Sequence, residues 1–173
     1  MDINALARVI TKAGMILLES GAETYRVEDT MKRIAIAYGA SVVDSYATPT
    51  LLIVSFSLDG ELCHNIKRTS VKTVDLTKID KVNDLSRKIS TANIPIEEFD
   101  KELDEIDQSE HYPKWLQILG ASICTFGFTF FFFGTLKDAI CAFILGAVLK
   151  FLLIKLEELS VSNFFMNIFG GGL

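Results

Sequence analysis

Charged and hydroxyl side chains gather in one short stretch near the start of the sequence. This stretch, from Ser20 to Ile34, reads SGAETYRVEDTMKRI. Glu23, Arg26 and Glu28 follow Gly21, where we expect a tight turn. Carboxylates and a guanidinium held at a turn can bind a charged ligand, and the carboxylates can also handle a proton, so these three residues are candidates for that chemistry. A structural role also stays open, because acids at a helix start are favoured by the helix dipole and pair with nearby cations.

The spacing in this stretch predicts how the chain turns. Ser20 and Glu23 have the S-x-x-E spacing of a capping box, in which each side chain bonds the other residue's backbone N–H. We therefore expect one helix to end near Ser20 and a second to begin directly after it. Apolar residues recur at helical spacing along both segments, which predicts an antiparallel pair of helices with one buried face each.

Four further candidates are Arg68, Lys150, Asn163 and Asn167. Arg68 follows a predicted hairpin and could pair with an acid of the second helix. Lys150 interrupts an apolar run, which indicates either binding of an anionic substrate or a long side chain that reaches the lipid headgroups. Asn163 and Asn167 are spaced i, i+4 ahead of three glycines. This pattern is typical of the broken helices that bind solutes in transporters, although packing or a helix end would also explain it.

Spacing and charge argue against several function classes. No nucleophile is spaced from a base as a catalytic pair requires, so we expect no catalytic residue and no enzymatic activity. His64 and His111 lie far apart and the three cysteines show no ligand spacing, so we expect no metal and no cofactor. The net charge is −5, and no basic patch is dense enough to bind nucleic acid.

The last third of the chain is apolar enough to enter a lipid bilayer. Trp115–Gly134 is a run without any charge, and as a helix it would be about 30 Å long, the thickness of a bilayer's hydrocarbon core. A second apolar run follows at once. We expect membrane spans at about 115–134 and 138–156, and the start of a third at about 159–173.

Glycines mark one side of the first expected span. Gly120, Gly127 and Gly134 recur every seven residues and therefore lie near one face of a helix. Small residues on one side of a membrane helix let another helix approach closely. The pattern predicts a packing groove, or else a path for a small solute past it.

The expected orientation places the N-terminus in the cytoplasm. No signal peptide is visible, and the N-terminal residues carry charges among their apolar side chains. Lys150 and Lys155 crowd the end of the second span, and basic residues favour the cytoplasmic side. We therefore expect a multi-pass protein of the cytoplasmic membrane, with Thr135–Asp138 as a short outer turn.

The residues before the first span predict a small mixed domain. Two helices are followed by runs rich in β-branched and aromatic residues, with Asp59-Gly60 as a strong hairpin signal, and then by two more helices. The run TLLIVSFSL is apolar on both faces and predicts the central strand. The expected fold class is an α+β cytoplasmic domain (α-α-β-β-β-α-α, residues 1–112) followed by transmembrane α-helices in residues 113–173.

The motif from Ser20 to Ile34 resembles the signature of the threonine/serine exporter family, which includes ThrE-like proteins and a split YjjP-like form. Further resemblances are Tyr112-Pro113-Lys114-Trp115 ahead of the first span and the closing FFMNIFGGG. The resemblance covers essentially the whole chain. The run G-A-E-T-Y-R-V-E-D-T is fairly specific, because it combines many unusual choices in a short space.

This resemblance implies a proton-coupled exporter in the bilayer. The family exports small amino acids such as threonine and serine or, in the split form, small dicarboxylates such as succinate. It implies an oligomer, completed by a second multi-span membrane subunit or by a missing C-terminal half, because the chain ends where the family's N-terminal half would continue. Two alternatives stay open: a membrane-tethered regulatory or ligand-binding domain without transport of its own, and a membrane-bound hydrolase.

Overall fold

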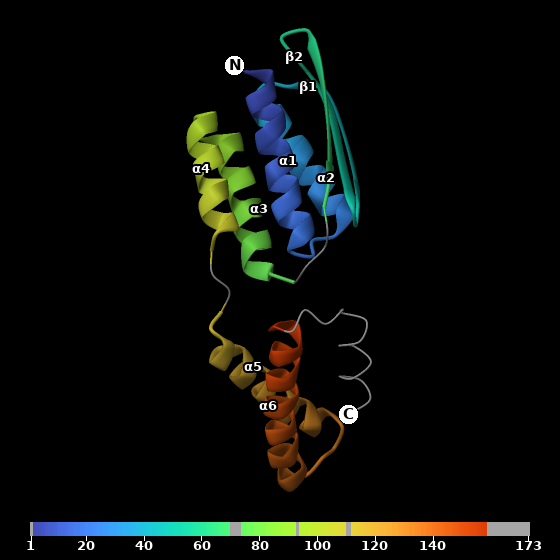
Figure 1. Cartoon of the computed structure of the whole chain (residues 1–173), viewed down its shortest axis with the longest axis vertical. Helices are drawn as coiled ribbons and strands as arrows, with labels where there is room; N and C mark the ends of the chain where they lie inside the picture. Colours follow the sequence, from blue (N-terminus) through green and yellow to red (C-terminus); the bar gives the residue numbers. More distant parts are fainter. Residues whose placement is uncertain (1, 70–73, 93, 110–111, 159–173) are drawn as a thin grey trace. The chain divides into compact units, whose positions relative to one another are not determined.

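The computed structural model describes residues 2–69, 74–92, 94–109 and 112–158 of the chain (Figure 1). Contacts divide the chain into two compact units, Met1–Glu110 and His111–Leu173. In the first unit the elements follow in the order α1, α2, β1, β2, β3, α3, α4, and the second unit contributes α5 and α6.

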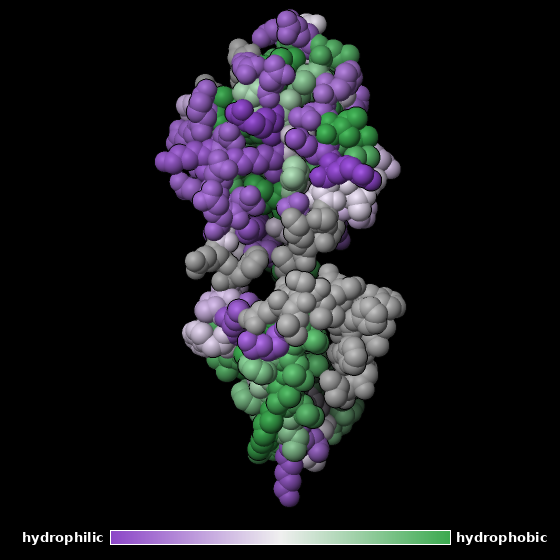
Figure 2. All heavy atoms as spheres, in the orientation of Figure 1, coloured by the Kyte–Doolittle hydropathy of each residue, from purple (hydrophilic) through white to green (hydrophobic). Residues whose placement is uncertain are grey.

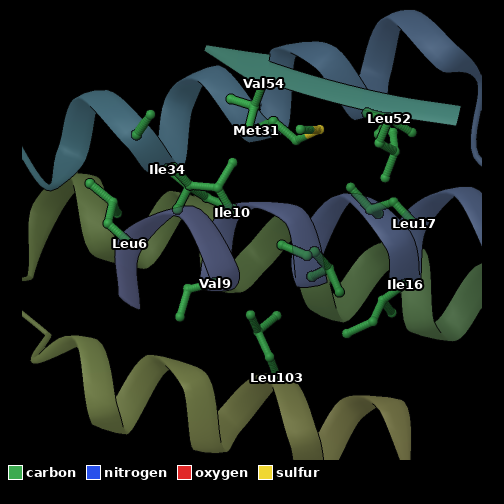
Figure 3. Close-up of a cluster of buried hydrophobic side chains, with 14 of the residues drawn as sticks. Leu6, Val9, Ile10, Ile16, Leu17, Met31, Ile34, Leu52, Val54 and Leu103 are labelled. Atoms are coloured by element: carbon green, nitrogen blue, oxygen red, sulfur yellow. The ribbon is translucent and has the colours of Figure 1, made fainter. Parts of the chain in front are cut away.

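Helix α1 (Ile3–Glu19) forms the centre of the first unit. Asp2 caps its start, because the carboxylate accepts a hydrogen bond from the Asn4 N–H at 3.0 Å. Most of its side chains are buried, and α2 (Thr24–Ala37) packs beside it. Figure 3 shows Leu103 on one side of α1 and Met31 on the other, so α1 is covered from both directions.

The three strands form one antiparallel sheet in the order β1-β2-β3: β1 (Ser41–Thr48), β2 (Leu51–Leu58) and β3 (Glu61–Arg68). The prediction that β2 is central is confirmed. Its side chains alternate, with Leu52, Val54, Phe56 and Leu58 buried against the helices and the residues between them partly exposed. In the described part of the chain, helices pack on one face of the sheet alone.

The hairpin between β2 and β3 turns through Asp59 and Gly60. Their φ angles are 51° and 86°, and two positive values in a two-residue loop make a type I′ turn. The twist of this turn matches that of the flanking strands, which sets the register in which Leu58 faces Glu61.

Two amphipathic helices complete the first unit. Asp75 caps α3 (Leu76–Thr91) by accepting hydrogen bonds from the N–H groups of Thr77 and Lys78 at 3.0 and 3.1 Å. Helix α4 (Ile96–Asp107) buries Phe99, Leu103 and Ile106. Phe99 meets the ring of Tyr38 edge to face, with 5.9 Å between the ring centroids.

The second unit is a pair of apolar helices, α5 (Lys114–Phe131) and α6 (Leu136–Glu158). Residues Leu136–Leu156 of α6 are long and apolar enough to cross a membrane. Most apolar side chains of both helices are exposed in this unit, and hydrophobic residues cover the visible face of the pair (Figure 2).

The expected fold class is wrong and needs correction. The described residues are mostly helical, with one small sheet of three strands, and among them α6 is the one helix that is long and apolar enough to span a membrane. Helix α5 falls short because it begins at Lys114, includes Gln117 and ends at Phe131, so that Phe132 and Phe133 lie in a turn. The structure therefore does not show a separate domain followed by several spans.

Small and hydroxyl residues hold α5 against α6. The Thr125 hydroxyl donates a hydrogen bond to the Ala142 carbonyl at 2.9 Å, and a Cβ at Gly146 would lie 2.3 Å from the same hydroxyl oxygen. The helix pair thus meets at Gly146, while none of the described residues outside α5 lies within 4 Å of a Cβ built at Gly120 or Gly127. The face that carries these two glycines does not form the contact with α6.

Candidate functional site

The turn between α1 and α2 positions the charged motif. Ser20 ends α1 as its C-cap, Gly21 follows with a φ of 82°, and Glu23 is the N-cap residue of α2. The Glu23 side chain makes no capping hydrogen bond, so the predicted capping box is wrong. Its place is taken by backbone hydrogen bonds, because the N–H groups of Gly21 and Ala22 bond the last carbonyls of α1 at 3.1 and 3.0 Å.

Glu23 and Arg26 point into solvent. Both side chains are exposed, and among the residues that the structure describes no ion pair involves Arg26. A hydrogen bond to the Glu23 carboxylate raises the pKa of Tyr25, because the negative charge disfavours ionisation of the phenol. These two residues are therefore accessible to a solute or to a partner.

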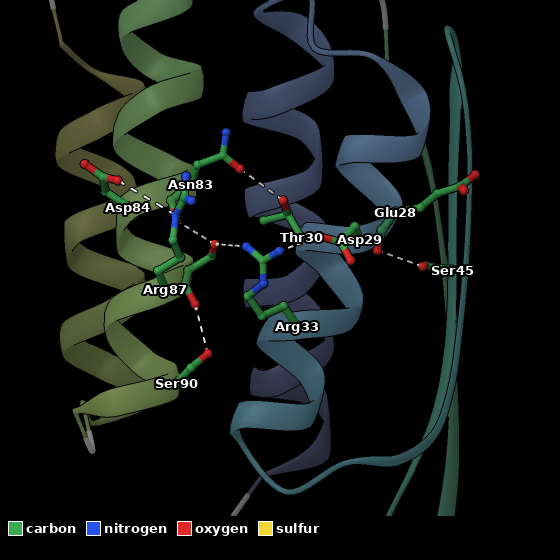
Figure 4. Close-up of polar contacts among 10 residues, drawn as sticks. Glu28, Asp29, Thr30, Arg33, Ser45, Asn83, Asp84, Arg87 and Ser90 are labelled. Atoms are coloured by element: carbon green, nitrogen blue, oxygen red, sulfur yellow. Dashed lines mark hydrogen bonds and ion pairs between the residues drawn. The ribbon is translucent and has the colours of Figure 1, made fainter.

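Glu28 joins α2 to the edge of the sheet. Its Oε1 accepts a hydrogen bond from the Ala47 N–H at 2.8 Å. Its backbone carbonyl accepts one from the Ser45 hydroxyl at 2.9 Å, which Figure 4 shows. β1 is an edge strand, so among the described residues no neighbouring strand accepts the Ala47 N–H on that side. Glu28 supplies that acceptor, which gives it a structural role in this fold.

Side chains in the next turn of α2 form hydrogen bonds with side chains of α3. The Thr30 hydroxyl donates to Asn83 Oδ1 at 3.2 Å, and Arg33 bonds the Ser86 hydroxyl at 3.4 Å while pairing with Asp29 (Figure 4). Thr30 and Ser86 are buried, so their hydroxyl groups need these partners. Much of the polar motif therefore holds α2 between the sheet and α3.

The remaining sequence candidates lie apart from the motif. Arg68 is the last residue of β3 and is exposed, and the described residues contain no ion pair between it and α2. Lys150 is half-buried in α6. Asn163, Asn167 and the third expected span (159–173) lie outside the described residues.

A second polar site was missed by the sequence reasoning. A cleft of about 210 Å³ lies among α1, β3 and α4 and is lined by side chains of both charges and by an apolar floor: Arg8, Thr11, Lys12, Met15, Ile16, Glu19, Lys67 and Asp107. Most of these residues recur every three or four positions on one face of α1, and that spacing was the available signal. It was missed because the partners on β3 and α4 are distant in sequence.

Two cations that line this cleft are paired with acids of α4 that lie outside its lining. Lys12 Nζ lies 2.6 Å from Asp100 and 2.7 Å from Asp104, and Arg8 lies 3.3 Å from Asp100. Partial burial opposes the charge of Lys12, but the hydrogen bonds that its ammonium donates to both carboxylates outweigh this effect and raise the pKa of Lys12. Lys67 is exposed and forms no ion pair with the described residues, so it can bind an anion.

The structure shows no grouping suited to a metal within the described ranges, where no three His, Cys, Asp or Glu side chains converge. All three cysteines are free. The charged side chains at the motif and the cleft can hydrogen-bond small charged solutes.

The sequence is similar to proteins that are described as transporters. A family described as "ThrE: Putative threonine/serine exporter" matches residues 8–173. The "Probable succinate transporter subunit YjjP" of Klebsiella aerogenes is 23% identical over 115 residues, which are 66% of this chain and 44% of that protein. The chain thus spans less than half the length of this curated relative. No solved structure matches the chain.

Proposed function

The chain belongs to the threonine/serine exporter family, and we propose that it is the N-terminal part of a membrane exporter of small amino acids, with threonine and serine as the first candidates. The observation that carries this proposal is the family match over residues 8–173. The apolar helix α6, with its exposed hydrophobic side chains, supports it, since such a surface is stable in lipid.

We place the N-terminus and residues 1–112 in the cytoplasm and residues 113–173 in the membrane region, in a multi-pass arrangement. Lys155 near the end of α6 supports this orientation, because basic residues favour the cytoplasmic side. Export would be driven by the proton gradient, and the exposed carboxylate of Glu23 is the proton-handling candidate beside Arg26. Lys150 and Arg68 are candidates for binding the substrate carboxylate.

A partner completes the transporter in this proposal. The curated relative is named a transporter subunit, and this chain covers less than half of that relative's length. A solute path needs more membrane helices than α5 and α6 provide in the described residues. A second multi-span subunit, or further residues of the same polypeptide, would supply them.

An export assay tests the function directly. Cells that lack their own exporters are loaded with a threonine-containing dipeptide and express the chain with its partner. We expect faster release of threonine than in cells without the chain. Faster release of succinate alone would replace the amino acid with a dicarboxylate, and no change for threonine, serine or succinate would reject the exporter.

Matched substitutions in the same cells test the residues. Glu23→Gln and Lys150→Gln should slow export at unchanged protein level, whereas Lys155→Gln, close to the end of the same helix as Lys150, serves as the control. If both test variants export as fast as the unchanged chain, these residues do not handle the proton or the substrate.

A second candidate function is a membrane-tethered sensor of the same solutes. The cleft beside α1 favours it, because a cleft with charges of both signs can hold a zwitterion. Calorimetry of the whole chain in detergent, with threonine and with succinate, tests this reading. Binding that is lost in Lys67→Gln supports the sensor, and a flat trace with both solutes rejects it.

A further inference from the structure

Strand β3 has an open edge. In a hairpin with a two-residue turn, the two residues that flank the turn form a backbone hydrogen-bonded pair, here Leu58 and Glu61. Glu61 and every other residue after it along β3 therefore direct their N–H and C=O groups toward β2. The Thr69 N–H donates to the Thr50 carbonyl at 3.0 Å, and Thr69 follows Glu61 by an even number of residues, so this hydrogen bond agrees with the alternation. Leu62, His64 and Ile66 therefore direct their N–H and C=O groups away from the sheet.

Nothing in the described part of the chain bonds those outward groups. At the opposite edge of the sheet, the Glu28 side chain accepts the N–H of Ala47 and covers β1. No comparable hydrogen bond reaches β3 from the residues that the structure describes. An uncovered edge strand of this length is a template for pairing with another strand.

We propose that two copies of this chain pair through their β3 strands, antiparallel and in one register, to form a continuous six-stranded sheet. In this register His64 faces His64 of the second copy, and Leu62 faces Ile66 of the second copy. All of these residues direct their backbone groups outward, so the two strands can exchange hydrogen bonds along the edge.

The side chains select this register and this partner. Glu61 begins β3 in the same hollow as Asp2 and Asp59, and Lys67 lies near its other end. Antiparallel pairing about His64 places Glu61 opposite Lys67 of the second copy, twice in each dimer. A shift by two residues would instead oppose Leu62 with Arg68, which loses both the charge pair and the apolar pair.

The pairing would also extend an apolar surface. Tyr46, Ile53 and Ile66 lie in one row across the three strands, on the face of the sheet that the helices leave uncovered. Tyr46 and Ile66 are 58% and 61% exposed. In the dimer, Leu62 of the second copy continues this row, so that the two outer faces join into one.

Disulfide trapping tests the geometry. The whole chain, purified in detergent with its three cysteines changed to serine, carries His64→Cys or, for comparison, Ile53→Cys. Oxidation at low protein concentration should convert the His64→Cys variant into a disulfide-linked dimer that a reductant cleaves. The Ile53→Cys variant should stay without this crosslink. Crosslinking through Ile53 at an equal rate indicates stacking of the two sheets and overturns the proposal, as does the absence of a crosslink at both positions.

A charge exchange on the otherwise unchanged chain tests the register independently. Glu61→Lys and Lys67→Glu each place like charges opposite each other at two points, so each should weaken the dimer by roughly fivefold or more in sedimentation measurements. The double variant restores both pairs and should recover the affinity. The pairing is rejected if the unchanged chain is a monomer, or if the double variant dimerises as weakly as the single variants. This outcome does not depend on whether the chain exports a solute.

Discussion

Substituting Glu28 is the sharpest test of the motif, because the structure gives this side chain a role in stabilising the fold. Replacing it with alanine removes the acceptor of the Ala47 N–H, which lies 2.8 Å from Oε1 on an edge strand. Replacing it with glutamine keeps an oxygen at the same place and removes the charge alone. The two variants therefore separate the hydrogen bond from the carboxylate's ability to hold a proton.

The magnitude follows from this contact. A hydrogen bond to a charged group contributes about 1.5–3 kcal/mol when buried, and a donor left unsatisfied costs about 1–3 kcal/mol. Glu28 is partly exposed, so water offsets some of the loss and we expect about 1–2 kcal/mol for Glu28→Ala. In a domain of this size each kcal/mol shifts Tm by about 4–8 °C, which gives a fall of about 5–15 °C. Glu28→Gln should cost less than half of that.

The assay is thermal unfolding of the whole chain in detergent, followed by far-ultraviolet circular dichroism. Glu23→Ala is the matched control, because that side chain is exposed and makes no capping bond, and its Tm should change by little. If Glu28→Ala keeps the Tm of the unchanged chain, or if Glu28→Gln is as unstable as Glu28→Ala, the edge-covering role is refuted. Loss of export in Glu28→Gln at unchanged Tm would reveal a proton-handling role instead.

Three further predictions concern single contacts. Burial and the nearby glutamates of α4 raise the pKa of Tyr38 to about 12, so the folded state keeps its phenolic proton to a higher pH than the unfolded state does. The contribution of Tyr38 to the free energy of unfolding should therefore be constant below about pH 10 and fall between pH 10 and 12. Tyr38→Phe should remove that part of the fall, as measured by urea unfolding at each pH. Asp75→Ala should destabilise the first unit by about 1 kcal/mol and Asp75→Asn by much less, as measured by urea unfolding, because asparagine also caps a helix. Gly146→Leu should move α5 away from α6 by more than Thr125→Val does, because Thr125→Val removes only one hydrogen bond, worth about 1 kcal/mol. The distance between spin labels on the two helices measures this separation, and an unchanged distance in Gly146→Leu would contradict the packing.

Local patterns determined much about this protein without any structure. The apolar spacing of Val27, Met31 and Ile34 predicted the buried face of α2, and the structure confirms it. Asp59-Gly60 predicted the hairpin, and the composition of TLLIVSFSL predicted the central strand. The resemblance to the exporter family, found in the Ser20–Ile34 motif, is confirmed by the family match. These signals succeed because each depends on residues that are neighbours in the chain.

Contacts between distant segments were decided by the tertiary structure alone. Ser20 and Glu23 have capping-box spacing, yet backbone bonds close the turn and Glu23 is left in solvent. Glu28 became a sheet-edge acceptor because β1 packs beside α2, which no local spacing encodes. Likewise, the cleft beside α1 exists because β3 and α4 converge on one helical face, and Lys12 meets Asp100 across 88 positions of sequence. A side chain's type limits the chemistry it can perform, but its partners depend on how the whole chain packs.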